Sequence, residues 1–368
     1  MTKVFAEFIV GGGKPLKLTY LLPVGGQGQI SSWQKGMFAM LPFRNKQAIG
    51  VFWQYCSQPH FECLEVFCSL RNINALPEST LALAQWIANY YVSPIESAVL
   101  LLAPGFVWNI EKFKAREKRS LKKQSSRVLS SLPSKKDILL TEEQVLCSRK
   151  IFNSKAGSVT LLQGVTGSGK TEVYLDVAAK VVFSEGKTVL VLVPEIALTP
   201  QMTQRFRAVF VNELAVLHSG LSALEYEREW FRVSEQKVKV VLGVRTAVFA
   251  PLKNVGLLIV DEEHDSSYKA EDMPCFNARD VAVVRSRIEG ARCILGSATP
   301  SLESIWNVQG SKYQHVFLQN KFSGQPTRHQ IIDSKKYLKI QKNASKQKNL
   351  QTSKIHFRET ILTPPVVD

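Results

Sequence analysis

Residues 159–171 read Val-Thr-Leu-Leu-Gln-Gly-Val-Thr-Gly-Ser-Gly-Lys-Thr, and this stretch decides the fold. Residues 159–163 predict a buried strand, and residues 172–183 predict the helix that follows. Between them stands the pattern G-x-x-x-x-G-K-[ST], whose glycines let successive backbone N–H groups face the phosphates of a nucleotide. A glycine-rich turn that matches by chance is the alternative, and the flanking strand and helix argue against it. We therefore expect an α/β domain with a parallel sheet that binds ATP or GTP.

Several residues in and near this loop are expected to bind different parts of the nucleotide. Lys170 places a positive charge near the β- and γ-phosphates, and the Thr171 hydroxyl can bind Mg²⁺. Gln144, in the preceding Leu-Thr-Glu-Glu-Gln stretch at 140–144, would place its amide against adenine and so favour ATP over GTP. The expected nucleotide-binding residues are Gln144, Gly164, Gly167, Ser168, Gly169, Lys170 and Thr171.

A second motif, Asp261-Glu262-Glu263-His264, follows the apolar run at 255–260. Such a run suits a central parallel strand, and acids at its carboxyl end reach the ligand crevice. Asp261 would hold Mg²⁺ together with Thr171, while Glu262 would orient and deprotonate the attacking water. A solvated acidic turn is the alternative, and the upstream phosphate loop disfavours it. The expected catalytic residues are thus Lys170, Asp261 and Glu262.

Other segments that contain small or hydroxyl-bearing residues follow predicted strands, at 194–201, 218–220, 243–251 and 296–300. Hydroxyl groups at such strand ends can sense the γ-phosphate and relay its loss to bound nucleic acid. Turns rich in Ser, Thr, Gly and Pro are common, so each segment alone is weak evidence. The residues expected to couple the two events are Arg245, His264, Ser297 and Thr299.

In this order the segments resemble the motifs of superfamily 2 helicases, and more closely those of the bacterial primosomal replication-restart helicases. Further similar stretches lie at 20–23, 41–43 and 83–91, so that the resemblance covers residues 1 to about 330. It implies a 3′→5′ DNA helicase that recognises stalled forks and helps reload the replicative helicase, using ATP and Mg²⁺. The implied partners are forked and single-stranded DNA, a nascent 3′ end, primosome and helicase-loading proteins, and single-stranded DNA-binding protein.

The resemblance also predicts the domain organisation. Residues 1–105 would form a small β-rich domain that binds a DNA 3′ end, with strands near 4–10 and 48–53. Residues 106–139 would be a basic linker or a reduced winged-helix remnant, with a charged helix at 111–132. Residues 140–318 would form a RecA-like domain, and 319–368 a basic tail that is disordered or truncated. Thr19 stands where family members often carry an acid, which weakens the expectation of tight 3′-hydroxyl recognition.

The loop after the acidic motif is rich in aromatic residues. In the family that it resembles, this loop couples single-stranded DNA binding to ATP hydrolysis. An aromatic ring can stack on a base while a lysine contacts the backbone, so the expected DNA-binding residues are Tyr268, Lys269, Phe276 and Arg279. Packing inside the protein is the equal alternative for the rings of Tyr268 and Phe276.

Charge and cysteine content add independent expectations. The net charge of +16 is uneven, because residues 112–150 hold 12 basic and 4 acidic side chains and residues 319–368 hold 10 and 3. Contact with DNA phosphates is expected of the first block, and a solvated tail of the second. The 6 cysteines include no C-x-x-C pair, so no zinc is expected although the family carries it. No signal peptide or long apolar run is seen, which predicts a cytoplasmic protein without membrane contact.

The sequence shows motifs for a single motor lobe, whereas helicases of this superfamily need two. We therefore expect a truncated, split or frameshifted member, or one that needs a separate polypeptide for the second lobe. Such a chain would bind nucleotide and unwind little or no DNA alone. Two functions stay open: a DNA-dependent ATPase of the restart-helicase type, and an ATP-binding protein that recognises forks or 3′ ends without turnover.

Overall fold

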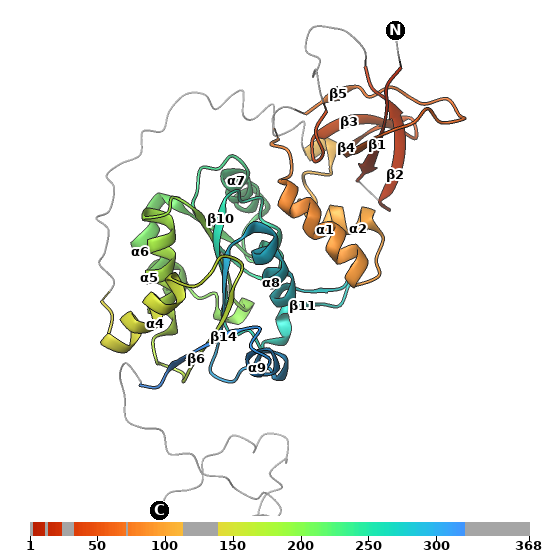
Figure 1. Ribbon diagram of the computed structural model, residues 1–368. Coiled ribbons are helices and arrows are strands. Elements are labelled where there is room, and N and C mark those ends of the chain that lie inside the picture. Colours follow the sequence, from red (N-terminus) through yellow and green to blue (C-terminus); the bar gives the residue numbers. More distant parts are fainter. Residues whose placement is uncertain (1–2, 12–13, 24–32, 71–72, 113–138, 321–368) are drawn as a thin grey trace, which may run out of the picture. The chain divides into compact units, whose positions relative to one another are not determined.

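The computed structural model describes residues 3–11, 14–23, 33–70, 73–112 and 139–320 (Figure 1). The charged helix expected at 111–132 and the tail expected at 319–368 fall almost wholly outside these residues, so both remain predictions. Within the described part, the mixed α/β fold expected from the sequence is confirmed: a β-rich N-terminal region precedes a parallel sheet flanked by helices.

The N-terminal region is a five-stranded antiparallel sheet with the order β2-β1-β4-β3-β5. Phe8 lies at its centre, where its ring meets those of Trp33 and Phe52 edge-on at centroid distances of 5.5 and 5.6 Å. Two helices, α1 and α2, follow the sheet. The bounds are β1 Phe5–Val10, β2 Leu16–Leu21, β3 Phe38–Phe43, β4 Lys46–Cys56, β5 Cys68–Ser69, α1 Glu78–Tyr90 and α2 Ile95–Leu100.

The second sheet has seven strands in the order β14-β6-β13-β10-β7-β9-β8, and every neighbouring pair is parallel. All carboxyl ends therefore lie at one edge, where open α/β sheets bind their ligands. The bounds are β6 Val159–Gly164, β7 Thr188–Leu192, β8 Leu214–Leu217, β9 Val240–Gly243, β10 Val255–Val260, β13 Arg292–Ser297 and β14 Gln314–Leu318.

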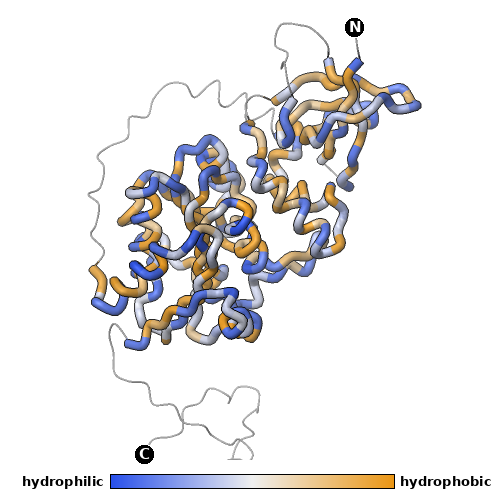
Figure 2. Tube along the Cα trace, viewed as in Figure 1, coloured by the Kyte–Doolittle hydropathy of each residue, from blue (hydrophilic) through white to orange (hydrophobic). Residues whose placement is uncertain are grey.

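Helices cover both faces of this sheet (Figure 1). Alternate residues of one strand belong to different cores, as Leu257 and Ile259 of β10 face one cluster while Leu258 and Val260 face the other. The central strands accordingly stand out as hydrophobic in Figure 2. One face carries α4 (Glu142–Phe152), α5 (Lys170–Phe183) and α6 (Pro200–Phe210), and the other carries α7 (Ala223–Ser234), α8 (Ala278–Glu289) and α9 (Leu302–Gln309).

Short elements connect the strand ends to these helices. They are the 3-10 turns η1 Glu195–Ala197, η2 Val211–Glu213, η3 Arg245–Phe249 and η4 Ser266–Tyr268, and the two-stranded ribbon of β11 Lys269–Ala270 and β12 Phe276–Asn277. Several helices begin at a residue whose side chain accepts a backbone N–H of the first turn, which satisfies a donor that the helix itself leaves free. These residues are Thr141, Thr199, Ser222, Asn277 and Ser301.

The edge strand β14 ends next to the phosphate loop. Leu318 pairs with Gly164 in the register between β14 and β6. Immediately afterwards, the Glu143 carboxylate of α4 accepts the backbone N–H groups of Gln319 at 2.7 Å and Asn320 at 3.2 Å. The end of β14 is thus fastened to the first turn of α4.

Candidate nucleotide and coupling site

The phosphate loop connects β6 to α5, as the sequence predicts. Gly167 and Gly169 have φ values of 80° and 82°, in the left-handed region where glycine carries no steric cost. A Cβ at Gly164 would lie 2.5 Å from Ser168 Oγ and 2.9 Å from Leu318 Cβ. Glycine at 164 is therefore needed to let the loop fold back against the sheet.

Two polar groups of this loop fit a phosphate ligand. The Lys170 ammonium is buried, donates to the Gly164 carbonyl at 3.0 Å and lies 3.5 Å from Glu262 Oε1. An ammonium has three donors, so these contacts leave it able to bind an anion. Ser168 Oγ is buried and has no hydrogen-bond partner among the described residues. A buried hydroxyl without a partner is uncommon and costs free energy, which a ligand oxygen would offset.

Gln144 makes a different contact from the one expected. The residue is 1 % exposed, and its side-chain oxygen accepts Thr141 N–H at 2.9 Å in the capping box of α4. Its amide nitrogen donates to the Ser168 carbonyl at 3.1 Å. In this structure the amide is hydrogen-bonded to the backbone of the phosphate loop, and the contact with adenine stays a prediction.

The acidic motif stands at the carboxyl end of β10, as predicted. Asp261 Oδ1 accepts a hydrogen bond of 2.9 Å from the Tyr174 hydroxyl. Burial and the neighbouring Glu262 charge raise the pKa of the Asp261 carboxyl, against the lowering effects of Tyr174 and Lys170. Glu262 has a φ of 44°, which is unusual for a residue with a side chain and marks a tightly constrained turn at this point.

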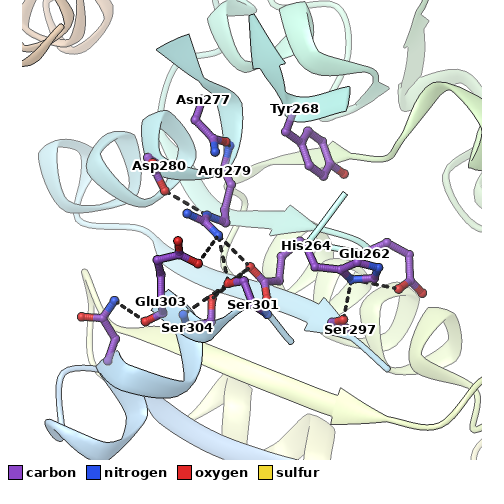
Figure 3. A network of polar contacts seen from close by, with 12 residues as sticks. Glu262, His264, Tyr268, Asn277, Arg279, Asp280, Ser297, Ser301, Glu303 and Ser304 are labelled. Atoms are coloured by element: carbon purple, nitrogen blue, oxygen red, sulfur yellow. Dashed lines mark hydrogen bonds and ion pairs between the residues drawn. The ribbon is translucent and has the colours of Figure 1, made fainter. Parts of the chain in front are cut away.

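His264 connects this motif with the Gly-Ser-Ala-Thr-Pro loop after β13 (Figure 3). Its Nδ1 lies 2.7 Å from Ser297 Oγ and 3.7 Å from Glu262 Oε2. Thr299 N–H donates to the same Ser297 oxygen at 3.0 Å. The structure thus brings His264, Ser297 and Thr299 together, and their coupling role stays a prediction.

Glu263, the third acid of the motif, is not among the residues expected to contribute, yet it forms the centre of a buried network. Its fully buried carboxylate accepts the N–H of Ser301 at 2.7 Å, that residue's hydroxyl at 3.0 Å and the Ser304 hydroxyl at 2.9 Å. Arg279 lies 3.3 Å from it and also contacts Asp280 at 2.9 Å. The network joins β10 to the starts of α8 and α9.

This network changes the role of Arg279. The sequence suggests DNA contact, but its side chain is 13 % exposed and is committed to Glu263, Asp280 and Ser301. A guanidinium held on several sides in this way orients the neighbouring helices. In this structure the Arg279 side chain therefore links the acidic motif to the starts of two helices, and its contact with DNA stays a prediction.

The rings of the loop at 265–276 are buried as well. Tyr268 is 1 % exposed and donates its hydroxyl to the Asp261 carbonyl at 2.6 Å, while Phe276 is 4 % exposed and meets Phe249 edge-on. Packing, the alternative given for both rings, is what this structure shows. Lys269 is exposed, and its carbonyl accepts a 2.8 Å hydrogen bond from Arg245. Of the four residues expected to contact DNA, Lys269 is the one that solvent can reach freely.

Tyr174 and Glu263 are the residues that reasoning from the sequence missed. Tyr174 stands four positions after Lys170 on a helix and so shares its face, which was a usable signal. Glu263 alternates with Glu262 and so points to another side of the strand end. The described residues contain no group of three or more His, Cys, Asp or Glu side chains arranged to hold a metal ion. None of the helices described has the length and apolar character needed to cross a membrane.

Comparison with known proteins places these features in a family. A model described as DEAD/DEAH box helicase matches residues 122–308, and one described as 3′DNA-binding domain (3′BD) matches residues 15–104. Among solved structures, RecG bound to a three-way DNA junction covers 76 % of this chain and 40 % of its own, at 18 % identity and a TM-score of 0.37.

Curated relatives named Replication restart protein PriA also match. The Rickettsia conorii protein is 36 % identical over 92 % of this chain and 49 % of its own length. The Haemophilus influenzae protein is 45 % identical over 60 % of this chain and 30 % of its own. The chain thus spans about half the length of the Rickettsia conorii relative and a smaller part of the Haemophilus influenzae relative. It belongs to the DEAD/DEAH box helicase family, and its similarity to known proteins is to replication restart protein PriA.

Proposed function

We propose that this chain carries the ATP-binding and DNA-binding parts of a 3′→5′ replication-restart helicase that recognises stalled forks and helps reload the replicative helicase. The observation that carries the proposal is the position of Lys170. Its ammonium lies between the Gly164 carbonyl and the Glu262 carboxylate, at the edge of the sheet where β6 and β10 both end. This is the arrangement that ATP hydrolysis requires, with a cation for the phosphates beside a carboxylate for water.

The residues present fit ATP and Mg²⁺. The partnerless Ser168 hydroxyl, the incompletely paired Lys170 and the left-handed glycines of the loop supply anion-binding groups. Thr171 and Asp261 supply the oxygen ligands that Mg²⁺ prefers, and Mg²⁺ would neutralise developing phosphate charge. Glu262 would accept a proton from the attacking water.

DNA is the proposed nucleic-acid substrate, through the N-terminal region matched as a 3′ DNA-binding domain and through Lys269. A nascent 3′ end, forked DNA and single-stranded DNA are the expected forms. Primosome components, helicase-loading proteins and single-stranded DNA-binding protein are the proposed protein partners. These follow from the similarity to replication restart proteins.

The experiment that tests this proposal compares the chain with its Lys170→Ala variant. ATP hydrolysis is measured with and without a forked DNA that carries a nascent 3′ end. We expect DNA-stimulated hydrolysis that the substitution abolishes. Fork binding by both proteins, without hydrolysis by either, would instead support the second candidate, a recognition protein without turnover. Equal weak hydrolysis by both proteins would contradict the assignment of the nucleotide site.

A further inference from the structure

Tyr174 follows the phosphate loop on α5 and contacts two other segments of the site, the acidic motif and the start of the loop at 296–300. It is fully buried on α5, four residues after Lys170, and its hydroxyl donates to Asp261 Oδ1 at 2.9 Å. The carboxylate oxygen therefore accepts a hydrogen bond from a donor that solvent does not reach.

We propose that Tyr174 is a positioning residue that fixes the Asp261 carboxylate for Mg²⁺-dependent nucleotide binding, an inference that rests on the function proposed above. Its hydroxyl holds one carboxylate oxygen, which leaves the other oxygen with a defined direction. The Tyr268 hydroxyl holds the backbone carbonyl of Asp261 at 2.6 Å. Two phenols thus fix this one residue, one through its side chain and one through its main chain.

Gly296 gives independent support, because it makes room for this arrangement. A Cβ at Gly296 would overlap the Tyr174 hydroxyl and lie 2.7 Å from its Cζ atom. Gly296 opens the Gly-Ser-Ala-Thr-Pro loop, and its carbonyl accepts the N–H of Glu263 at 3.0 Å. At Gly296 the backbone of β13 lies so close to the Tyr174 ring that only glycine fits.

The test measures binding of a fluorescent ATP analogue, methylanthraniloyl-ATP, by the whole chain. Affinity is determined with EDTA and across a Mg²⁺ titration, and the ratio of the two affinities is compared between proteins. The variants are Tyr174→Phe, Gly296→Ala and the double variant. Tyr313→Phe is the matched control, because it removes a hydroxyl from a half-buried tyrosine just before β14, at the opposite edge of the sheet.

We expect Tyr174→Phe to bind nucleotide in EDTA like the unchanged chain, while the Mg²⁺ enhancement falls about ten- to hundredfold, as for one hydrogen bond to a charged group. Tyr313→Phe should keep the full enhancement. Gly296→Ala should lose a similar amount because its methyl displaces the ring, and the double variant should lose little more. The ratio is formed within each protein, so a lower stability of a variant does not imitate the effect.

Two different results would overturn the inference. An unchanged Mg²⁺ enhancement in Tyr174→Phe would show that the tyrosine only fills space. A lack of Mg²⁺-dependent binding in the unchanged chain, or binding that Lys170→Ala does not reduce, would refute the proposed function and this inference with it. The first result leaves the proposed function standing, so the two failures can be told apart.

Discussion

Replacement of Glu263 by alanine tests whether the buried network stabilises the helicase domain. In the intact chain, the carboxylate accepts hydrogen bonds from the Ser301 backbone, the Ser301 hydroxyl and the Ser304 hydroxyl, and it pairs with Arg279. Without this carboxylate, the Arg279 guanidinium still pairs with Asp280, but the Ser301 N–H and the Ser304 hydroxyl lose their hydrogen-bond acceptor. The substitution also leaves a small cavity.

The expected loss follows from these contacts. Breaking a buried ion pair by removing one partner costs about 3 to 5 kcal/mol, and a hydrogen bond to a charged group contributes about 1.5 to 3 kcal/mol. These terms overlap, because the same carboxylate makes all the contacts. We expect Glu263→Ala to lower the free energy of unfolding by about 3 to 5 kcal/mol.

Glu303 provides the matched control, because it faces the same guanidinium from solvent. Its side chain is 70 % exposed and lies 3.8 Å from Arg279, so Glu303→Ala should cost less than about 1 kcal/mol. Urea unfolding followed by far-ultraviolet circular dichroism measures both variants against the unchanged chain. Equal shifts of the unfolding midpoint in the two variants would refute the reasoning, since burial would then make no difference.

Other substitutions probe other parts of the chain. Lys269→Gln should weaken single-stranded DNA binding at low salt and lower its salt slope by about one, whereas Lys187→Gln, beside Glu185, should change neither; a filter-binding titration over salt concentration decides this. Arg292 hydrogen bonding lowers the pKa of Glu185 from its ordinary value, so its contribution to stability is present above the unfolded pKa and is lost as pH falls through the folded one. Glu185→Gln should therefore cost about 1 kcal/mol at pH 7 and less in acid, measured by urea unfolding over a falling pH series. Gly164→Ala should reduce nucleotide affinity at least tenfold by equilibrium titration, because its methyl would lie 2.5 Å from a loop hydroxyl; an affinity that does not change would contradict the tight packing of the loop.

The phosphate loop and the acidic strand end were predictable from the sequence. Each combines a run of strand-forming residues with a short motif, and both cues are local in the chain. Parallel strand topology then requires Lys170 and Glu262 to meet at one edge of the sheet, as they do at 3.5 Å. The fold class could be inferred by the same route.

The partners of individual polar side chains were not predictable in this way. Arg279 and Tyr268 are residue types that often contact nucleic acid, but which side of a loop faces the core depends on helices far away in the sequence. Glu263 accepts hydrogen bonds from Ser301, 38 positions later, and no pattern in the chain predicts that pairing. Gln144 is similar, since its contact with Ser168 depends on how α4 packs against the loop.

The pairing of Leu318 with Gly164 also connects the strand β14 to the phosphate loop. Neighbouring strands lie about 5 Å apart, so the end of β14 lies one strand spacing from that loop. A parallel ladder cannot slip by one residue without turning every side chain to the opposite face. We therefore expect a displacement of the end of β6 to move β14 as well. A spectroscopic probe placed at Asn320 would then report movement of the nucleotide loop.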